Sequence, residues 1–232
     1  MALVPFTYAN PFHDALRDEQ RLFFIADRRV VISQGWKDDG KGGTAIGFGA
    51  SVYDAAICLS LYLDAHPDLV HGKRVIELGC GPGLVGIAAG CVGAAHVCIT
   101  DGDPASVALT QRNVEQNDLT EDQCSVREYL WGTNTAAVDD AAPYDVILGA
   151  DIIACPYADA FDALLKSFVA LSNANTRLLL AYKRRSGSEQ RFFAKFRSKF
   201  VIEQIDASNL HADFQHGEIT LFEARLKMPS NT

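Results

Sequence analysis

The sequence has 232 residues, of which 48% are hydrophobic and 22% are charged, a balance typical of one well-buried globular domain. Its formal net charge of −8 argues against a nucleic-acid scaffold, because such a protein needs a basic face to neutralise phosphates. The sequence contains neither a secretory signal pattern nor an apolar run long enough to span a membrane, so we expect a soluble protein.

The cysteines favour free thiols over disulfides or a metal site. They form no C-x-x-C pair, have no histidine cluster at metal-ligand spacing, and several sit inside apolar runs. The six positions are Cys58, Cys80, Cys91, Cys98, Cys124 and Cys155. We interpret them as reduced, mostly buried side chains, which predicts a cytoplasmic protein, with the nucleus as a second compartment, and no bound metal.

The first 50 residues predict an extension that precedes the main domain. Apolar runs at 22–25 and 30–33, separated by charged residues, indicate a short hairpin. Six glycines within 35–49 indicate a loop. We therefore divide the chain into an N-terminal extension with its loop over 1–50 and one α/β domain over 51–232.

From residue 51 onward, helices and strands are expected to alternate. Helical spacing of apolar residues predicts a first helix over 52–65, with Ser51 as its N-cap and Pro67 ending it. Five strands are predicted at 73–78, 96–100, 124–129, 144–148 and 176–182. Further helices are predicted at 84–91, 104–117, 158–171 and 188–200, and a surface loop at 133–143.

The alternation predicts a mostly parallel sheet with right-handed crossovers. Two closing strands, 200–205 and 218–226, lie too close in sequence for a helical crossover. We therefore expect them to pair antiparallel at one edge of the sheet.

A glycine-rich turn after the strand 73–78 carries the strongest functional signal. Gly79, Gly81 and Gly83 alternate along it, and Glu77 lies at the end of the strand. Glycines let the backbone approach a ligand closely, and the helix start that follows offers free N–H groups. The pattern predicts a nucleotide-type ligand at the carboxyl edge of the sheet.

Two ligands compete for this turn. A G-x-G-x-x-G spacing that starts at Gly81 satisfies the dinucleotide fingerprint, with Asp101 about 20 residues beyond the turn to bind a ribose. However, Glu77 would repel a pyrophosphate, and Pro82 removes one N–H donor. S-adenosylmethionine has no phosphate and brings a cationic ammonium and a sulfonium, which favour a nearby carboxylate. We therefore favour S-adenosylmethionine and keep NAD as the alternative.

Five short blocks follow one another in a fixed order, at 52–56, 75–86, 100–103, 130–132 and 147–151. Together they resemble the seven-β-strand S-adenosylmethionine-dependent methyltransferases of family 16, the distantly related protein-lysine methyltransferases. The resemblance implies an α/β, Rossmann-like class I methyltransferase fold over 51–232. Its seven-stranded sheet would have the order 3-2-1-4-5-7-6, with helices on both faces and the hairpin as an N-terminal extension.

The turn and the resemblance together assign a set of residues to the methyl donor: Tyr53, Glu77, Gly79, Cys80, Gly81, Gly83, Asp101, Trp131 and Ala150. The resemblance implies that Asp101 accepts hydrogen bonds from the ribose hydroxyls and that Trp131 lies beside the adenine. Tyr53 occupies a position where the family usually has tryptophan, and its ring can still cover the donor. Structural roles stay open beside these: Asp101 or Glu77 could cap a helix, and the two aromatic residues could be ordinary half-buried side chains.

Asp151 is the candidate catalytic residue, because it follows a strand at the edge where open α/β sheets bind ligands. We predict that it orients the acceptor nitrogen or attracts a lysine ammonium before deprotonation. The family has an Asp-x-x-Tyr motif here, whereas this sequence places Ala154 at the aromatic position and offers Tyr157 as a replacement. The basic run 183–185 could contact the substrate or simply be solvated.

These observations predict an S-adenosylmethionine-dependent N-methyltransferase that acts on a lysine side chain of a protein substrate. We expect a monomer with neither nucleic acid nor a membrane as partner. Two alternatives remain open. One is a small-molecule N-methyltransferase on the same fold, and the other is a non-catalytic or NAD-binding module with the same Rossmann-like shape.

Overall fold

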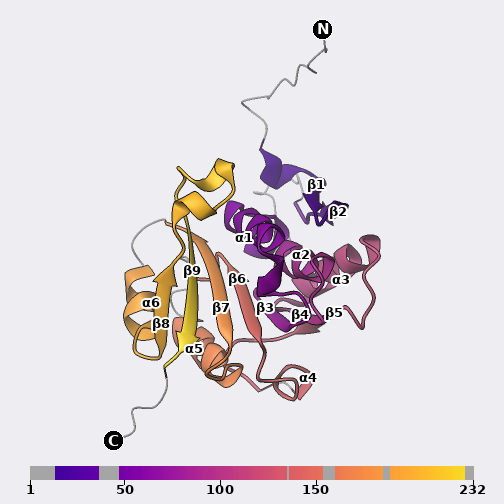
Figure 1. Ribbon diagram of the computed structural model, residues 1–232. Coiled ribbons are helices and arrows are strands. Elements are labelled where there is room, and N and C mark those ends of the chain that lie inside the picture. The colour runs from indigo at the N-terminus through magenta and orange to yellow at the C-terminus, as the bar shows by residue number, and fades with distance from the viewer. Residues whose placement is uncertain (1–13, 37–46, 135, 154–159, 185–188, 228–232) are drawn as a thin grey trace, which may run out of the picture.

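The computed structural model describes residues 14–36, 47–134, 136–153, 160–184 and 189–227. Its centre is a seven-stranded sheet in the order β5-β4-β3-β6-β7-β9-β8 (Figure 1). Numbered within the sheet, these strands follow the predicted order 3-2-1-4-5-7-6, which is confirmed. The strands are β3 (Arg74–Leu78), β4 (His96–Asp101), β5 (Cys124–Glu128), β6 (Val146–Ala150), β7 (Arg177–Lys183), β8 (Phe200–Gln204) and β9 (Ile219–Leu226).

The five strands from β3 to β7 run parallel, and β9 is antiparallel to both of its neighbours. The antiparallel pairing of the two closing strands is therefore confirmed. The last strand lies between β7 and β8, so β8 forms the edge of the sheet.

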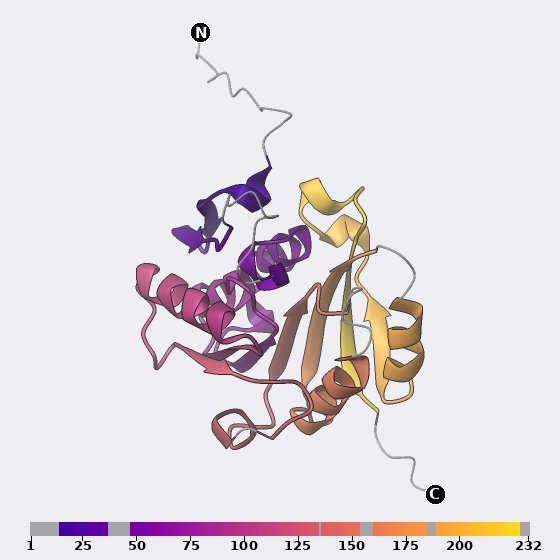
Figure 2. The same ribbon diagram turned by 180° about the vertical axis from the view of Figure 1, so that it is seen from behind.

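Helices cover both faces of this sheet (Figure 1, Figure 2). On one face lie α1 (Asp54–Ala65), α2 (Leu84–Cys91) and α3 (Pro104–Gln116), and on the other lie α5 (Phe161–Ala170) and α6 (Glu189–Phe196). Side chains of β3 alternate between them: Val75 is buried with the first group and Ile76 with the second. Because both faces are covered, the central strands β3 and β6 are buried along almost their whole length.

The predicted N-terminal hairpin is confirmed as β1 (Gln20–Ile25) and β2 (Arg28–Ser33), preceded by the 3-10 helix η1 (Ala15–Arg17). Its inner face packs into the same core as α1 and α2 through Ile25, Val30 and Ile32, all at most 1% exposed. The extension is therefore packed against the domain (Figure 2).

Side chains of α3 and of its C-cap residue, Asn117, form hydrogen bonds with the free edge of β2. Asn117 accepts a hydrogen bond from the Val31 N–H at 2.8 Å and donates one to the Val31 carbonyl at 2.7 Å. Asn113 makes the same two contacts with Ser33, at 2.9 and 3.0 Å. Two asparagine amides thus take the place of a neighbouring strand.

Two local predictions were wrong. The N-cap of α1 is Tyr53, and Ser51 instead donates its hydroxyl to the Leu16 carbonyl at 2.7 Å, which ties the extension to the start of the helix. The predicted loop 133–143 contains a short helix, α4 (Ala136–Asp139), because its alanines favour helix where Val138 can be buried. Short 3-10 helices occur at η2 (Gly47–Ala50), η3 (Pro67–Leu69), η5 (Ala207–Asn209) and η6 (Ala212–Phe214).

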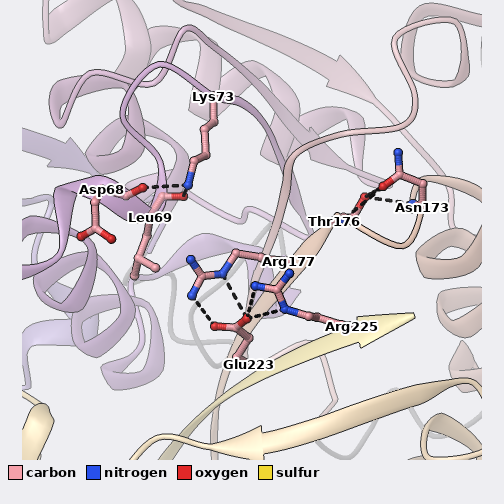
Figure 3. Close-up of polar contacts among 8 residues, drawn as sticks. All are labelled: Asp68, Leu69, Lys73, Asn173, Thr176, Arg177, Glu223 and Arg225. Carbon is pink, nitrogen blue, oxygen red and sulfur yellow. Dashed lines mark hydrogen bonds and ion pairs between the residues drawn. The ribbon is translucent and has the colours of Figure 1, made fainter. Parts of the chain in front are cut away.

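Hydrogen bonds and ion pairs connect residues near the amino ends of β3 and β7 (Figure 3). Arg177 and Arg225 each donate an Nε–H to the same Glu223 oxygen at 3.0 Å, and Arg177 binds the second oxygen as well. Lys73 donates to the carbonyls of Asp68 and Leu69 at 2.7 and 3.1 Å. These contacts lie at the edge opposite the carboxyl ends of the parallel strands.

Within the described ranges, every cysteine is a free thiol. The helices of those same ranges are all too short or too polar to cross a bilayer.

Candidate functional site

A cavity of about 550 Å³ lies at the carboxyl ends of β3, β4 and β6. This volume lies in the range of small-molecule and cofactor sites. Of the ten predicted site residues, nine line it: Tyr53, Glu77, Gly79, Cys80, Gly81, Asp101, Trp131, Ala150 and Asp151. We call this space the donor cavity.

The glycine turn forms the floor of the donor cavity. Gly79 and Gly81 have φ values of 68° and 53°, in the left-handed region that side chains with a Cβ rarely adopt. A Cβ on Gly79 would lie 2.7 Å from Ile152 Cγ2 and 3.1 Å from Trp131 Cζ2. The turn therefore needs glycine both for its backbone conformation and for its close fit against the opposite wall.

Gly83 does not line the cavity, so its assignment to the donor stays a prediction. It is the N-cap of α2 with a φ of 86°, and a Cβ there would lie 2.5 Å from Thr110 Cγ2. The glycine is needed for the start of α2 and its packing on α3. The spacing alone could not separate these two reasons for a glycine.

Asp101 ends β4 and reaches across to the glycine turn. Its Oδ2 accepts the Gly81 N–H at 3.0 Å, and its Oδ1 accepts the Asp103 N–H at 3.0 Å. Burial raises the pKa of this carboxyl, and the backbone hydrogen bonds oppose that rise. Asp103, and not Asp101, caps α3, so the helix-cap alternative for Asp101 is removed. A carboxylate offers about four lone-pair sites, so these backbone contacts leave Asp101 able to accept a ligand hydroxyl.

Glu77 lies on the cavity wall with only 2% of its surface exposed. Its Oε2 accepts the Gly86 N–H at 2.8 Å in the first turn of α2. Glu77 therefore does cap a helix with one of its oxygens, as the alternative role allowed. Burial raises the pKa of the Glu77 carboxyl to about 8, although the Gly86 hydrogen bond opposes the shift. A cation in the cavity would favour the ionised form of this carboxyl.

Aromatic side chains form the opposite wall. Trp131 and Tyr53 are both half-buried at the cavity, and the segment around Trp131 is held by α5. Ser167 of α5 accepts hydrogen bonds from the Tyr129 hydroxyl at 3.2 Å and from the Gly132 N–H at 2.8 Å. These contacts hold the segment that carries Trp131 in position.

The described residues fit S-adenosylmethionine better than a dinucleotide. The lining contains the carboxyl groups of Glu77, Asp101, Asp103 and Asp151, whereas none of its described residues is a lysine or an arginine. A pyrophosphate would meet this acidic wall without a compensating cation, whereas an ammonium and a sulfonium would be attracted. The N-terminus of α2, which would bind a phosphate, already donates to Glu77.

Asp151 follows β6 in a left-handed conformation, with a φ of 58°. Its N–H donates to the Ala181 carbonyl at 2.8 Å, and its Oδ1 accepts the Lys183 N–H at 2.8 Å. These contacts hold the Asp151 carboxylate against the end of β7. Ala154 and Tyr157, on which the altered motif depends, lie outside the described residues.

Several lining residues were not predicted from the sequence, among them Gly49, Ser106, Leu130 and Ile152. A Cβ on Gly49 would lie 2.3 Å from Ser106 Oγ, so this glycine lets the segment before α1 press against α3. The predicted loop 35–49 includes Gly49, but the residue that Gly49 approaches, Ser106, is more than 50 positions away in the sequence. Within the described ranges, no three acidic, histidine or cysteine side chains converge on a metal position.

The sequence model of a family described as "Lysine methyltransferase" matches residues 38–199. Protein N-lysine methyltransferase METTL21A of Danio rerio is 37% identical over 235 aligned positions, which cover 100% of this chain and 99% of the relative. EEF1A lysine methyltransferase 3 of Xenopus tropicalis is 29% identical and covers 78% of this chain and 79% of its own length.

A solved structure supports the fold. The 16S rRNA N2 G1207 methyltransferase of T. thermophilus, in complex with AdoMet and guanosine, superposes with a TM-score of 0.61. The two chains are 18% identical, and the match covers 95% of this chain and 53% of the other. At this identity the similarity shows the Rossmann-like methyltransferase fold.

Proposed function

This chain belongs to the lysine methyltransferase family, whose methyl donor is S-adenosylmethionine, and we propose that it methylates the side-chain nitrogen of a lysine in a protein substrate. The names of its relatives support a protein acceptor, because they describe protein N-lysine and EEF1A lysine methyltransferases.

One observation carries the proposed arrangement of the reaction. Asp151 borders the donor cavity at the end of β6, and the Lys183 N–H holds its carboxylate there at 2.8 Å. A carboxylate in this position can attract and orient a lysine nitrogen beside the donor. Tyr53, at the start of α1, lies on the same cavity and can exclude water from the reacting groups.

The chemistry requires alignment more than covalent participation by the protein. When bound, S-adenosylmethionine supplies an electrophilic methyl carbon on its sulfonium, and methyl transfer leaves S-adenosylhomocysteine. The side chains of this protein must hold the lysine nitrogen in line with that carbon and in its neutral form. Asp151 would orient the nitrogen, while Asp101 and the glycine turn would fix the donor.

Labelling tests this function directly. Purified protein is incubated with tritiated S-adenosylmethionine and a cell lysate, and labelled proteins are identified by gel and by mass spectrometry of their lysines. We expect labelled protein bands that require the added enzyme, with the added methyl groups on lysine. Label confined to the small-molecule fraction would instead support the small-molecule alternative.

Calorimetry with S-adenosylmethionine and with NAD tests the donor separately from the acceptor. We expect heat of binding with S-adenosylmethionine alone. Binding of NAD without binding of S-adenosylmethionine would contradict the proposal at its first step.

We also propose that the protein acts as a monomer in the cytoplasm or nucleus on an acceptor other than nucleic acid. The formal charge of −8 supports an acceptor other than nucleic acid, and the free thiols of the described cysteines support the reducing compartment. Light scattering after gel filtration tests the monomer, and imaging of the tagged protein tests the compartment.

A further inference from the structure

A second cavity, of about 680 Å³, adjoins the donor cavity. Tyr53 and Asp151 line both spaces, so the two cavities meet at these side chains. The second cavity differs in chemistry, because its described lining includes four carboxyl groups and three cationic groups. We call it the acceptor cavity.

Distant parts of the chain build the acceptor cavity. Asp14 comes from the segment before η1, Asp54 is the first residue of α1, Lys183 ends β7, and Glu218 precedes β9. The N-terminal extension and the C-terminal strand region therefore both contribute to the wall on the far side of Asp151 from the donor. This placement gives the extension a direct route to influence the choice of substrate.

An ion pair lies within this cavity beside Asp151. Lys183 Nζ is 3.4 Å from Asp54 Oδ2, and the backbone N–H of the same lysine donates to Asp151 Oδ1 at 2.8 Å. The side chains of Lys183 and Asp54 are 38% and 57% exposed, so both charges face the cavity and solvent. An unpaired Lys183 ammonium here would repel a lysine that approaches Asp151.

We propose that the acceptor cavity admits the substrate lysine and that Asp54 determines its acceptance by neutralising Lys183. This inference rests on the proposed function and adds a specificity-determining residue to it. With the pair formed, Lys183 no longer opposes an incoming ammonium, and the Asp151 carboxylate, which borders both cavities, remains to attract it. Asp54 acts through Lys183 and does not touch the reacting atoms.

The test uses two analogues of S-adenosylhomocysteine in which a nitrogen replaces the sulfur. One carries an aminobutyl arm in place of the transferable methyl group, and the other carries a neutral pentyl arm. The affinity ratio of the two probes reports how strongly the acceptor cavity prefers a cation, independently of turnover. Calorimetry gives this ratio for the wild type and for each variant, with S-adenosylhomocysteine as the measure of an intact donor cavity.

We expect the wild type to prefer the amine probe and Asp54→Asn to lose about fivefold of that preference, in line with the strength of a partly exposed ion pair. The double variant Asp54→Asn with Lys183→Met should recover the preference, because the uncompensated cation is gone. Asp54→Glu, which keeps the charge, should also retain it. A purely structural role for Asp54 would not be rescued by removal of Lys183.

Two results would overturn the inference while leaving the proposed function intact. One is an equal affinity of the wild type for both probes, and the other is a preference that Asp54→Asn leaves unchanged. Failure of S-adenosylhomocysteine to bind any form of the protein would reject the proposed function itself, together with the inference that depends on it.

Discussion

Asn113 pairs with Ser33 as a neighbouring β-strand would, accepting the serine N–H at 2.9 Å and donating to its carbonyl at 3.0 Å. The same Asn113 amide also donates to the Pro82 carbonyl at 2.8 Å, within the glycine turn. One buried side chain of α3 therefore connects the N-terminal hairpin to the floor of the donor cavity.

Replacing this side chain should affect both stability and donor binding. We expect Asn113→Ala to lower the free energy of unfolding by about 2 kcal/mol, because it leaves buried backbone groups without partners. Donor affinity should also fall, since the Pro82 contact is lost. Asn117→Ala is the matched control: it breaks the equivalent pair with Val31 but does not reach the turn. Urea unfolding and calorimetry separate the two effects, and equal donor affinities of both variants would contradict the connection.

Two glycines with nearly the same φ provide a test of the cavity floor. Gly79 and Gly72 have φ values of 68° and 67°, but a Cβ on Gly72 would meet nothing within 4 Å. Gly72→Ala should cost about 1 kcal/mol of stability from backbone strain alone and leave donor binding unchanged. Gly79→Ala should in addition weaken S-adenosylmethionine binding by at least about tenfold, because its methyl group meets Trp131 and Ile152. Calorimetry measures the affinity of each variant for S-adenosylmethionine. Equal affinities of the two variants would show that the turn does not contact the donor.

The buried carboxyl of Glu77 should couple donor binding to proton release. Its pKa of about 8 means that it is mostly protonated at neutral pH, and a bound cation should lower that pKa. We expect the enthalpy of S-adenosylmethionine binding at neutral pH to depend on the ionisation enthalpy of the buffer, and affinity to rise as pH increases toward 8. Glu77→Gln should abolish the buffer dependence. Proton uptake by the wild type would show that the sign is wrong.

The same pKa has a consequence for stability without the donor. The folded-state pKa of Glu77 is about 8, whereas its ordinary value is 4.5. Between pH 4.5 and 8, the Glu77 carboxyl therefore binds more protons in the folded protein than in the unfolded chain. The contribution of Glu77 to stability should therefore be largest below pH 4.5 and decrease as pH rises toward 8. Thermal unfolding of the wild type and Glu77→Gln across this range measures the contribution.

Asp151→Asn should separate methyl transfer from donor binding. Asparagine adopts the left-handed conformation of this position readily and keeps an acceptor for the Lys183 N–H, so only the charge is lost. We expect transfer to a protein acceptor to fall by at least about a hundredfold while S-adenosylmethionine still binds. Asp118→Asn is the control, since Asp118 has a φ of 57° but lies exposed after α3. Full turnover by Asp151→Asn would remove this carboxylate from the acceptor side.

Glu223 should stabilise the sheet far from the site. Burial raises its pKa, but Arg177 and Arg225 outweigh that effect and hold the pKa below its ordinary value. Glu223→Gln should therefore lower stability at neutral pH by about 1 kcal/mol, and the difference should vanish as pH falls through the folded-state pKa. Glu121→Gln, which breaks an exposed pair with Arg127, should change little. An identical pH profile for both variants would reject the stabilising role.

The sheet order followed from sequence because the family resemblance and the alternation of strands with helices fixed which strands neighbour one another. The glycine turn was also visible, since glycines and a carboxyl residue lie within a few positions of each other. The close packing of Gly83 against Thr110 was not visible, because Thr110 lies on another helix. The pairs that Asn113 and Asn117 form with β2 join residues about 80 positions apart, and no local pattern marks such partners.

The insertion of β9 between β7 and β8 has a consequence for biosynthesis. Strand β9 pairs with both β7 and β8. The sheet can therefore be completed only after residues 219–226 have left the ribosome. Until then, two strands emerge with open edges that another chain could pair with. A stop codon before Ile219 should therefore yield an aggregating product, although the glycine turn and Asp151 would already be present.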